Sequence, residues 1–525
     1  MNSEVISGGR SSFEKDFRGF GEFFFEQADK FSDKACQIDG LTGQQETYSN
    51  VKKRSARLAL HMERLGIVPG DIIISCMKNS MNSVIPHIGT LCLGAIMSAV
   101  DPTQSKREWT HCAKILKPKL IFVDEDVSEE MAMVVESLQE KPELIVVGKS
   151  KKFKTFADLQ IPLPEEQKFK PITINNCHST ALIIFSSGTT GLPKGICLSH
   201  FSIINEMKNA LYFIRQPAVS LNYATFYWIS AILVLMSTFH YGGARLILPK
   251  FDAEELLRKI EEHKITFIFM PPLYTFNLTN VKNSEKYDTS SLRILVIAGS
   301  SVSPTQLIRT KKLFKYSLVA VAYGTTEAGG FITITGDKEF EDNHSTIGKP
   351  VKDIDLKIID PATGKLLGPN QKGEICIKSL YGMTGYYNMD SSPYFDDEGF
   401  IKSGDLGYYD DNGCFYIVER IKEMFKYKSW HVVPSFVESI LMEHPAVLES
   451  GVFGLPHEVD EYHPAACVVL KDTASVDLDE IQSFVSNNVS EWQRLRGGIK
   501  VVENLPRTPS SKIQRSKLVE LFLSS

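Results

Sequence analysis

Residues 186–195, SSGTTGLPKG, have the composition of a loop that binds phosphate. They include three glycines, four hydroxyl side chains and one lysine, Lys194. Glycines let backbone N–H groups approach an anion, hydroxyls add hydrogen-bond donors, and the lysine adds a positive charge. The apolar run ALIIF precedes the loop and suits a buried strand. The pattern therefore predicts an anion site, with a flexible Gly/Ser/Thr turn as the alternative.

The loop does not fit two common phosphate-binding patterns. A Walker loop needs Gly-Lys followed by Ser or Thr at the start of a helix. Here Pro193 precedes Lys194 and Gly195 follows it. No HRD or DFG occurs in the context that a protein kinase requires. If the loop binds phosphate, it uses another geometry.

The elements that must position this loop show alternating periodicities. Segments with helical spacing of apolar residues alternate with short β-rich runs through the first four hundred residues, which predicts parallel sheets covered on both faces. Ser49 is the expected N-terminal cap of the first predicted helix, Tyr48–Leu65. The predicted helices are Tyr48–Leu65, Ser80–Leu93, Ala253–His263 and Pro304–Phe314, and the predicted strands are Asp71–Met77, Pro118–Asp124, Leu144–Val147, Thr266–Met270 and Leu318–Ala322.

The pattern changes after about Val351. Short strands separated by turn signals predict a small β-rich region. From Arg420 onward the chain becomes a compact mixed segment with a helix at Pro434–Glu443, a strand at Ala465–Leu470 and a helix at Leu478–Val489. We therefore predict two parts, residues 1–419 and 420–525.

Length and composition exclude several classes of protein. A chain of 525 residues is too long for one compact core. Lys plus Arg is 58 and Asp plus Glu is 63, so no overall positive charge attracts nucleic acid. Nine cysteines without zinc spacing favour free thiols.

Targeting signals are weak throughout. The first twenty residues lack the apolar stretch of a secretory signal. No segment suits a membrane span, because the apolar run Ile229–Leu248 carries His240 and Arg245. The Ser516–Leu518 tripeptide SKL is internal and cannot serve as a peroxisomal signal. We expect a cytoplasmic or a peroxisomal protein, and the sequence gives no sign of its oligomeric state.

Five further motifs accompany the loop in a fixed order. With it, the chain resembles the adenylate-forming superfamily of acyl-CoA synthetases, 4-coumarate–CoA ligases, beetle luciferases and adenylation domains. It is most similar to the luciferase-like fatty acyl-CoA synthetases of insects. The motifs are YGTTE at 323–327, GYYN at 385–388, SGDLGY at 403–408, IVERIKEMFKY at 417–427 and PRTPSSKIQR at 506–515.

The resemblance implies an α/β multi-domain fold. A large N-terminal domain would contain two doubly wound αβ subdomains and a β-barrel, and a small α+β C-terminal domain would close over it as a mobile lid. The implied enzyme is an AMP-forming acid–thiol ligase that uses ATP, Mg²⁺ and coenzyme A. Its partners would be CoA and a small hydrophobic carboxylic acid, with a medium- or long-chain fatty acid the first expectation.

The resemblance also implies roles for individual residues. Ser186, Ser187, Gly188, Thr189, Thr190, Gly191 and Lys194 would hold the β- and γ-phosphates. Tyr323 and Gly324 would contact adenine, Thr326 the α-phosphate, and Glu327 the magnesium ion. Asp405 would accept the ribose hydroxyls and Arg420 would contact ribose or phosphate. A tyrosine after an apolar run is also a common core residue.

Lysines from the last hundred residues complete the implied site. Lys512 would contact the substrate carboxylate and the α-phosphate while the adenylate forms. Lys422 would be the hinge of the small domain, and Lys426 would enter the site in a second conformation for thioester formation. Lys422, Lys426 and Lys428 are alternatively a solvated basic stretch.

Four positions depart from the family pattern. Tyr227 or Trp228 stands where a histidine is typical of the acyl site, which favours an apolar acid. Ser300-Ser301, Ser429 and Ser511 replace residues that are usually glycine or alanine. The alternatives are a luciferase-like monooxygenase on the same adenylate, an inactive acyl- or nucleotide-binding homologue, and a module that loads a separate carrier protein.

Overall fold

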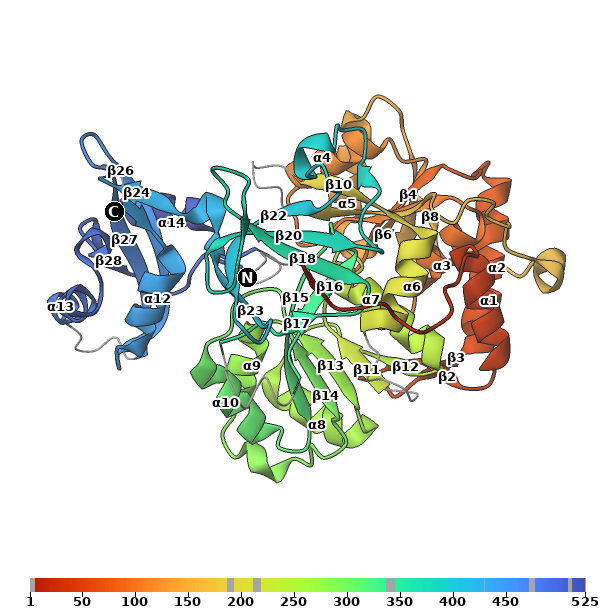
Figure 1. Ribbon diagram of the computed structural model, residues 1–525. Helices are drawn as coiled ribbons and strands as arrows, with labels where there is room; N and C mark the ends of the chain where they lie inside the picture. The colour runs from red at the N-terminus through yellow and green to blue at the C-terminus, as the bar shows by residue number, and fades with distance from the viewer. Residues whose placement is uncertain are drawn as a thin grey trace.

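The computed structural model describes residues 5–186, 193–210, 219–336, 345–428, 430–471, 477–508 and 512–524, with the backbone alone for 207–210 and 431. Four sheets organise the chain, and Figure 1 shows them as distinct lobes. No helix within the described ranges is long and apolar enough to cross a membrane.

The first sheet has eight strands in the order β21-β10-β9-β5-β4-β6-β7-β8. Strands β9 to β8 in this order are parallel, whereas β10 runs antiparallel to both neighbours. Its strands are β4 (Ile72–Cys76), β5 (Ile96–Ala99), β6 (Leu120–Asp124), β7 (Glu143–Val147), β8 (Lys154–Thr155), β9 (Thr180–Ser186), β10 (Lys194–Ser199) and β21 (Gly385–Tyr386). The helices of this region are α1 (Phe20–Lys30), α2 (Tyr48–Arg64), α3 (Val84–Cys92), α4 (Lys106–Leu116), α5 (Ser128–Ser137) and α6 (His200–Ala210).

The second sheet has nine strands in the order β17-β16-β15-β14-β13-β11-β12-β2-β3. Its middle strands are parallel and its outer strands β3, β16 and β17 are antiparallel. The strands are β2 (Ala35–Asp39), β3 (Gln45–Thr47), β11 (Val219–Asn222), β12 (Ala244–Ile247), β13 (Phe267–Met270), β14 (Ile294–Ile297), β15 (Leu318–Thr325), β16 (Gly330–Ile334) and β17 (Lys349–Pro350). Its helices are α7 (Ile229–Tyr241), α8 (Ala253–His263), α9 (Pro272–Thr279) and α10 (Pro304–Leu313).

Helix α7 lies between these two sheets. Ile232, Leu235 and Phe239 belong to the core of the first sheet, whereas Leu233 and Val234 pack with the strands of the second. A helix buried on both sides must be apolar around its whole circumference. This explains why residues 229–248 look hydrophobic enough to suggest a membrane segment and still carry Arg245.

The third sheet is antiparallel, in the order β1-β18-β20-β22-β23, with β19 beside β18. It is the predicted β-rich region, and a bridge from Gly348 to Phe415 extends it toward β17. In Figure 1 its strands lie between the two α/β lobes and the C-terminal part. Its strands are β1 (Ile6–Ser7), β18 (Ile354–Ile359), β19 (Leu366–Leu367), β20 (Gly373–Ser379), β22 (Ile401–Tyr409) and β23 (Phe415–Arg420).

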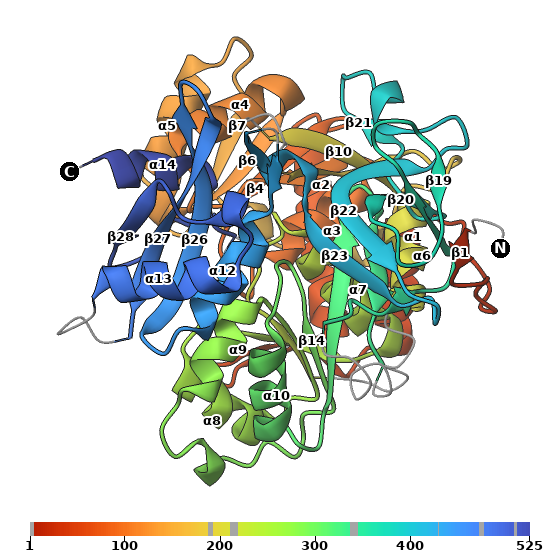
Figure 2. The ribbon, with the colours of Figure 1, turned by 60° about the vertical axis from the view of Figure 1, so that its left-hand side comes forward.

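The C-terminal part has its own five-stranded sheet and helices on both faces (Figure 2). Along β27, Ala466 and Val468 pack with α12 and α13, while Ala465 and Cys467 pack with α14. This alternation is the two-residue period of a strand. The elements are β24 (Phe425–Tyr427), β25 (Trp430–Val432), α12 (Pro434–Glu443), β26 (Val447–His457), β27 (Glu461–Leu470), α13 (Leu478–Asn488), β28 (Gly498–Val501) and α14 (Arg515–Leu523).

The structure confirms the predicted fold class, with two corrections in detail. The cap of α2 is Thr47 rather than Ser49, because the Thr47 hydroxyl accepts the Asn50 N–H at 3.2 Å. The two large sheets are mixed at their edges rather than wholly parallel. All nine cysteines are free, as predicted. The boundary between residues 419 and 420 stays a prediction. It falls one residue before the end of β23, and the next strand, β24, belongs to a different sheet.

Candidate active site

A cavity of about 1420 Å³ lies at the carboxyl ends of strands from both α/β sheets. This edge is where open α/β sheets bind ligands. The antiparallel sheet and the C-terminal part complete its wall. The predicted site residues that line it are Ser186, Lys194, Tyr227, Trp228, Gly324, Thr326, Glu327, Arg420, Lys422 and Lys512.

Three predicted residues that the structure describes do not line the cavity: Tyr323, Asp405 and Lys426. Tyr323 and Asp405 are buried beneath its wall. Lys426 is exposed on β24, opposite His431 in the strand pairing. The structure therefore brings most of the predicted site together and leaves Lys426 outside. Ser187, Gly188, Thr189, Thr190 and Gly191 lie outside the described residues.

Antiparallel pairing of β9 with β10 holds both ends of the predicted phosphate loop together. Ser186 and Lys194 are direct partners in this pairing. The Lys194 Nζ donates to the Tyr394 hydroxyl at 2.5 Å and lies 4.5 Å from the centre of that ring. A fixed positive charge therefore stands beside the loop. Tyr394 has no signal in the sequence that could have identified it.

Glu327 lies beside Ser186, the first residue of the predicted phosphate loop. Its Oε1 accepts from the Ser186 hydroxyl at 3.3 Å and from the Tyr386 hydroxyl at 3.2 Å. Burial and the Glu327 carboxylate raise the pKa of Tyr386, which keeps this phenol neutral and able to donate. Mg²⁺ prefers oxygen ligands, and these carboxylate and hydroxyl oxygens lie next to the predicted phosphate loop. The residues present therefore fit this ion.

Asp405, Arg420 and Tyr323 form a cluster at the cavity wall, in which Arg420 lines the cavity and Asp405 and Tyr323 are buried behind it. Asp405 on β22 is the direct partner of Arg420 on β23. The Arg420 Nε lies 2.7 Å from Oδ1 of Asp405, and the Tyr323 hydroxyl donates to Oδ2. Burial raises the pKa of Asp405 and Arg420 opposes this rise. Both carboxylate oxygens are thus occupied, and Tyr323 packs in the core of the antiparallel sheet.

Glycines let the backbone bend and pack closely at this cluster. Gly404 has a φ of +72°, a conformation that favours glycine, and its N–H donates to Glu374 at 2.9 Å. A Cβ at Gly324 would lie 2.3 Å from the Gly330 carbonyl oxygen. Gly324 is therefore required by the approach of β15 to β16, whatever it contacts in a ligand.

Lys512 enters the cavity from the C-terminal part. The Thr508 N–H donates to the Lys512 carbonyl at 2.7 Å, and the Lys512 N–H donates to the Thr508 hydroxyl at 3.1 Å. The side chain lines the cavity, where the charges of Arg420 and Asp405 act on it. Burial, and then the charge of Arg420, lower the pKa of Lys512.

Arg515 connects the Lys512 segment to the predicted hinge. Its guanidinium pairs with Glu423 and, at 2.9 Å, with both oxygens of Glu438; its Nε donates to the Val452 carbonyl at 3.1 Å. Glu423 follows Lys422, whose pKa is lowered by burial and by Arg420. These contacts hold the arrangement in which Lys512 faces the cavity. Arg515 belongs to a predicted motif, but nothing in the sequence assigned it this role.

Part of the cavity wall is aromatic. Tyr227 is buried and packs edge-on against Trp228, with ring centres 4.9 Å apart. Phe251 and Tyr274 stack with ring centres 3.8 Å apart, and Tyr223 meets both edge-on. Such walls suit a substrate that carries its carboxylate at one end and an apolar group at the other.

Glu206 on α6 is a buried carboxylate that the sequence did not reveal. Its Oε1 accepts the Phe331 N–H at 3.1 Å, and no bond to Oε2 is found among the described residues. Burial raises the pKa of Glu206 to about 8. Because an unfolded glutamate titrates near 4.3, the folded chain holds this proton more tightly.

The elevated pKa of Glu206 predicts a pH-dependent loss of stability. As pH rises from about 4.5 to about 8, the free energy of unfolding should fall by about 1.4 kcal/mol per unit from this group. Chemical denaturation of the wild type and of Glu206→Gln across this range would measure the difference. The variant should show a flatter profile; parallel profiles would contradict the assignment.

Comparison with known proteins identifies the family. Residues 24–387 match the AMP-binding enzyme family, and residues 437–512 match the AMP-binding enzyme C-terminal domain. The luciferin 4-monooxygenase of Photuris pensylvanica is 30% identical over 96% of this chain and 95% of its own. The 4-coumarate–CoA ligase CCL1 of Humulus lupulus is 28% identical over 94% of this chain and 92% of its own.

Two solved structures show the same fold. The luciferase-like enzyme from the nonluminescent mealworm Zophobas morio is 39% identical, covers 80% of this chain and 100% of its own, and superposes with a TM-score of 0.77. The anthranilate CoA ligase AuaEII, with anthranoyl-AMP, is 21% identical over 96% of this chain and 97% of its own, with a TM-score of 0.84. The chain therefore belongs to the AMP-binding enzymes, the adenylate-forming family of luciferases and CoA ligases.

Proposed function

We propose that the chain is an ATP-dependent ligase that joins a hydrophobic carboxylic acid, in the first instance a medium- or long-chain fatty acid, to CoA. One observation supports this most strongly. One cavity is lined both by the polar residues Ser186, Lys194, Glu327 and Lys512 and by the aromatic residues Tyr227 and Trp228. The polar residues suit phosphates and a carboxylate, and the aromatic residues suit an acyl tail.

In the first half-reaction, a carboxylate oxygen attacks the α-phosphorus of ATP and pyrophosphate leaves. Two anions must meet, so positive charge is needed where they approach. Lys512 would contact both groups, and Thr326 would contact the α-phosphate. Lys194 and residues 186–191 would hold the outgoing phosphates. When bound at Glu327, Mg²⁺ would neutralise phosphate charge.

The nucleoside would lie against this cluster of Asp405, Arg420 and Tyr323 at the cavity wall. Asp405 would accept the ribose hydroxyls once the bonds from Tyr323 and Arg420 rearrange. Arg420 would then contact ribose or phosphate as a permanent cation. Stacking of adenine on Tyr323 requires this ring to become accessible, since only 9% of the residue is exposed.

In the second half-reaction, the thiol sulfur of CoA attacks the acyl carbonyl carbon, the thiol proton is lost and AMP leaves. We propose that the C-terminal part turns about Lys422 for this step and brings Lys426 to the cavity. The exposed position of Lys426 on β24 is consistent with a residue that is used in another arrangement.

Pyrophosphate release tests the proposal. The protein would be incubated with Mg-ATP and a panel of fatty and aromatic acids, with and without CoA. Release that depends on an apolar acid and increases with CoA is the expected result. No release with any acid, despite binding of ATP, would exclude a ligase and favour an inactive homologue.

A second candidate is a luciferase-like monooxygenase, in which O₂ reacts at the same adenylate. The likeness to a luciferin 4-monooxygenase and to a luciferase-like enzyme favours it. Light emission with luciferin, Mg-ATP and oxygen would support this activity. If no light is emitted and a thioester forms, the ligase activity is supported and the monooxygenase activity is not.

The aromatic part of the cavity wall predicts a specific effect of Trp228. Trp228→Ala should raise the KM for the preferred acid by about tenfold, which corresponds to ~1.4 kcal/mol of lost apolar contact. The KM for ATP should change little, because Trp228 belongs to the aromatic part of the wall. Steady-state pyrophosphate release gives both constants. An equal change in both would contradict the assignment of Trp228 to the acyl site.

A further inference from the structure

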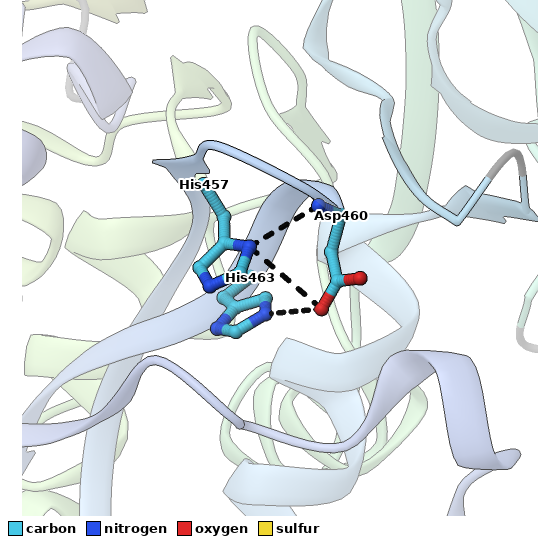
Figure 3. Close-up of side chains that lie close together, drawn as sticks. All are labelled: His457, Asp460 and His463. Atoms are coloured by element: carbon cyan, nitrogen blue, oxygen red, sulfur yellow. Dashed lines mark hydrogen bonds and ion pairs between the residues drawn. The ribbon is translucent and has the colours of Figure 1, made fainter.

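Three potential metal ligands meet at the tip of the β26–β27 hairpin (Figure 3). His457 ends β26, Asp460 lies in the turn, and His463 lies near the start of β27. One ligand atom from each residue lies within 4.8 Å of the other two. The cluster is separate from the cavity, because none of the three residues lines it.

The hairpin fixes the positions of these side chains. The His463 Nε2 lies 2.8 Å from Oδ2 of Asp460, and the His457 Nδ1 lies 3.7 Å from the same oxygen. The two imidazole rings are nearly parallel, with centres 3.8 Å apart. The N–H groups of Val459 and Asp460 point to the His457 Nδ1 at 3.4 and 3.1 Å. These contacts hold both imidazoles beside Asp460 when no ion is bound.

The spacing of the donor atoms suits a small divalent cation. Two ligand atoms bound at about 2.0–2.1 Å in a tetrahedral site lie about 3.4 Å apart. The distances of 2.8 and 3.7 Å to Asp460 lie on either side of this value. To bind one ion, the two imidazole rings would rotate out of their parallel stack, and the ion would replace the N–H groups of Val459 and Asp460 at the His457 Nδ1. It would also replace the proton between His463 and Asp460.

The donor types select the class of ion. Imidazole suits Zn²⁺, Cu²⁺ and Ni²⁺, whereas Mg²⁺ and Ca²⁺ prefer oxygen ligands alone. The side chains of His457, Asp460 and His463 are 40%, 15% and 23% exposed, so further positions remain for water. Glu458 and Glu461 add negative charge at the same turn. From these observations we propose that His457, Asp460 and His463 bind one transition-metal cation of the Zn²⁺ class.

One neighbouring group opposes the binding of a cation. The Lys428 Nζ lies 3.7 Å from Oδ1 of Asp460, and its side chain is 59% exposed. The charge of Lys428 should weaken binding without preventing it, because solvent screens an exposed charge. Removal of the Lys428 charge should therefore strengthen metal binding, a result that a purely structural role of the histidines would not produce.

Titration of the full-length protein, freed of any affinity tag, tests the site directly. Calorimetry with ZnCl₂ should show one saturable site, and CoCl₂ should give the visible absorption of a site with nitrogen and oxygen ligands. His457→Ala, His463→Ala and Asp460→Asn should each weaken binding by at least tenfold. His178→Ala, another exposed histidine, is the matched control and should bind as the wild type does.

Two further results complete the test. Lys428→Gln should bind about twofold to threefold more tightly than the wild type. Circular dichroism would verify that the variants fold. If a histidine variant fails to fold, Asp460→Asn still tests the site, because it preserves the size of the side chain. Absence of saturable binding, equal affinity in the cluster variants and the control, or the thiolate absorption of cobalt bound to cysteine would each overturn the proposal.

Discussion

Lys512→Ala should lower the rate of pyrophosphate release at saturating ATP and acid by about a hundredfold or more. Lys512 is the side chain that the C-terminal part supplies to the cavity, and the charges of Arg420 and Asp405 act on it. Loss of one group that stabilises developing charge in an enclosed site costs about 10²–10³ in kcat. Lys517→Ala is the matched control, because Lys517 is exposed on the helix α14 that follows Lys512, does not line the cavity and should leave the rate unchanged.

The pH dependence of the adenylation rate gives a second test of the role of Lys512. Burial, followed by the charge of Arg420, lowers the pKa of Lys512. If the charged form is needed, adenylation should decline on the alkaline side at a lower pH than an ordinary lysine would give. In Lys512→Arg the remaining activity should lose this decline, since arginine stays protonated. An unchanged alkaline limb in that variant would assign the titration to another group.

Asp405→Ala should impair both the binding of ATP and the stability of the protein. The substitution removes the partner of Arg420 and the acceptor of the Tyr323 hydroxyl in a site where Asp405 is only 2% exposed. Removal of one partner from a buried ion pair costs about 3–5 kcal/mol. Denaturant unfolding should show a loss of about 3 kcal/mol, and the KM for ATP should rise by about tenfold or more.

Asp405→Asn separates these two effects. An asparagine oxygen can still accept one hydrogen bond, so part of the stability should return, although Arg420 still lacks its counter-charge. The KM for ATP should stay high, because the amide offers a single acceptor where two ribose hydroxyls need one each. Wild-type affinity for ATP in either variant would show that Asp405 does not bind the nucleotide.

Local patterns in the sequence predict local elements well. The apolar spacing at 253–263 and 434–443 predicts α8 and α12 with the bounds that the structure has. These helices begin after a capping residue or at a proline, and each buries one apolar face. Most site residues that the motifs predicted and the structure describes also line the cavity, because glycine, hydroxyl and charged residues in these combinations have few purely structural uses.

Contacts distant in sequence could not be predicted in the same way. Strand β2 joins β12 across about two hundred residues, and β21 joins β10 across a similar separation, so the strand order of the two sheets was not predicted. Tyr394 and Glu206 matter through Lys194 and Phe331, which lie far from them in the chain. The pairing of Asp405 with Arg420 depends on strand register, which the turn between β22 and β23 determines.

The central claim is that this chain forms an acyl-adenylate and transfers the acyl group to CoA. A single-turnover experiment with enzyme in excess over ATP, quenched and separated by chromatography, tests it most directly. The account predicts acyl-AMP and pyrophosphate from Mg-ATP and an apolar acid, then acyl-CoA and AMP in equal amounts when CoA is added. Formation of ADP, or an adenylate that CoA does not consume, would contradict it.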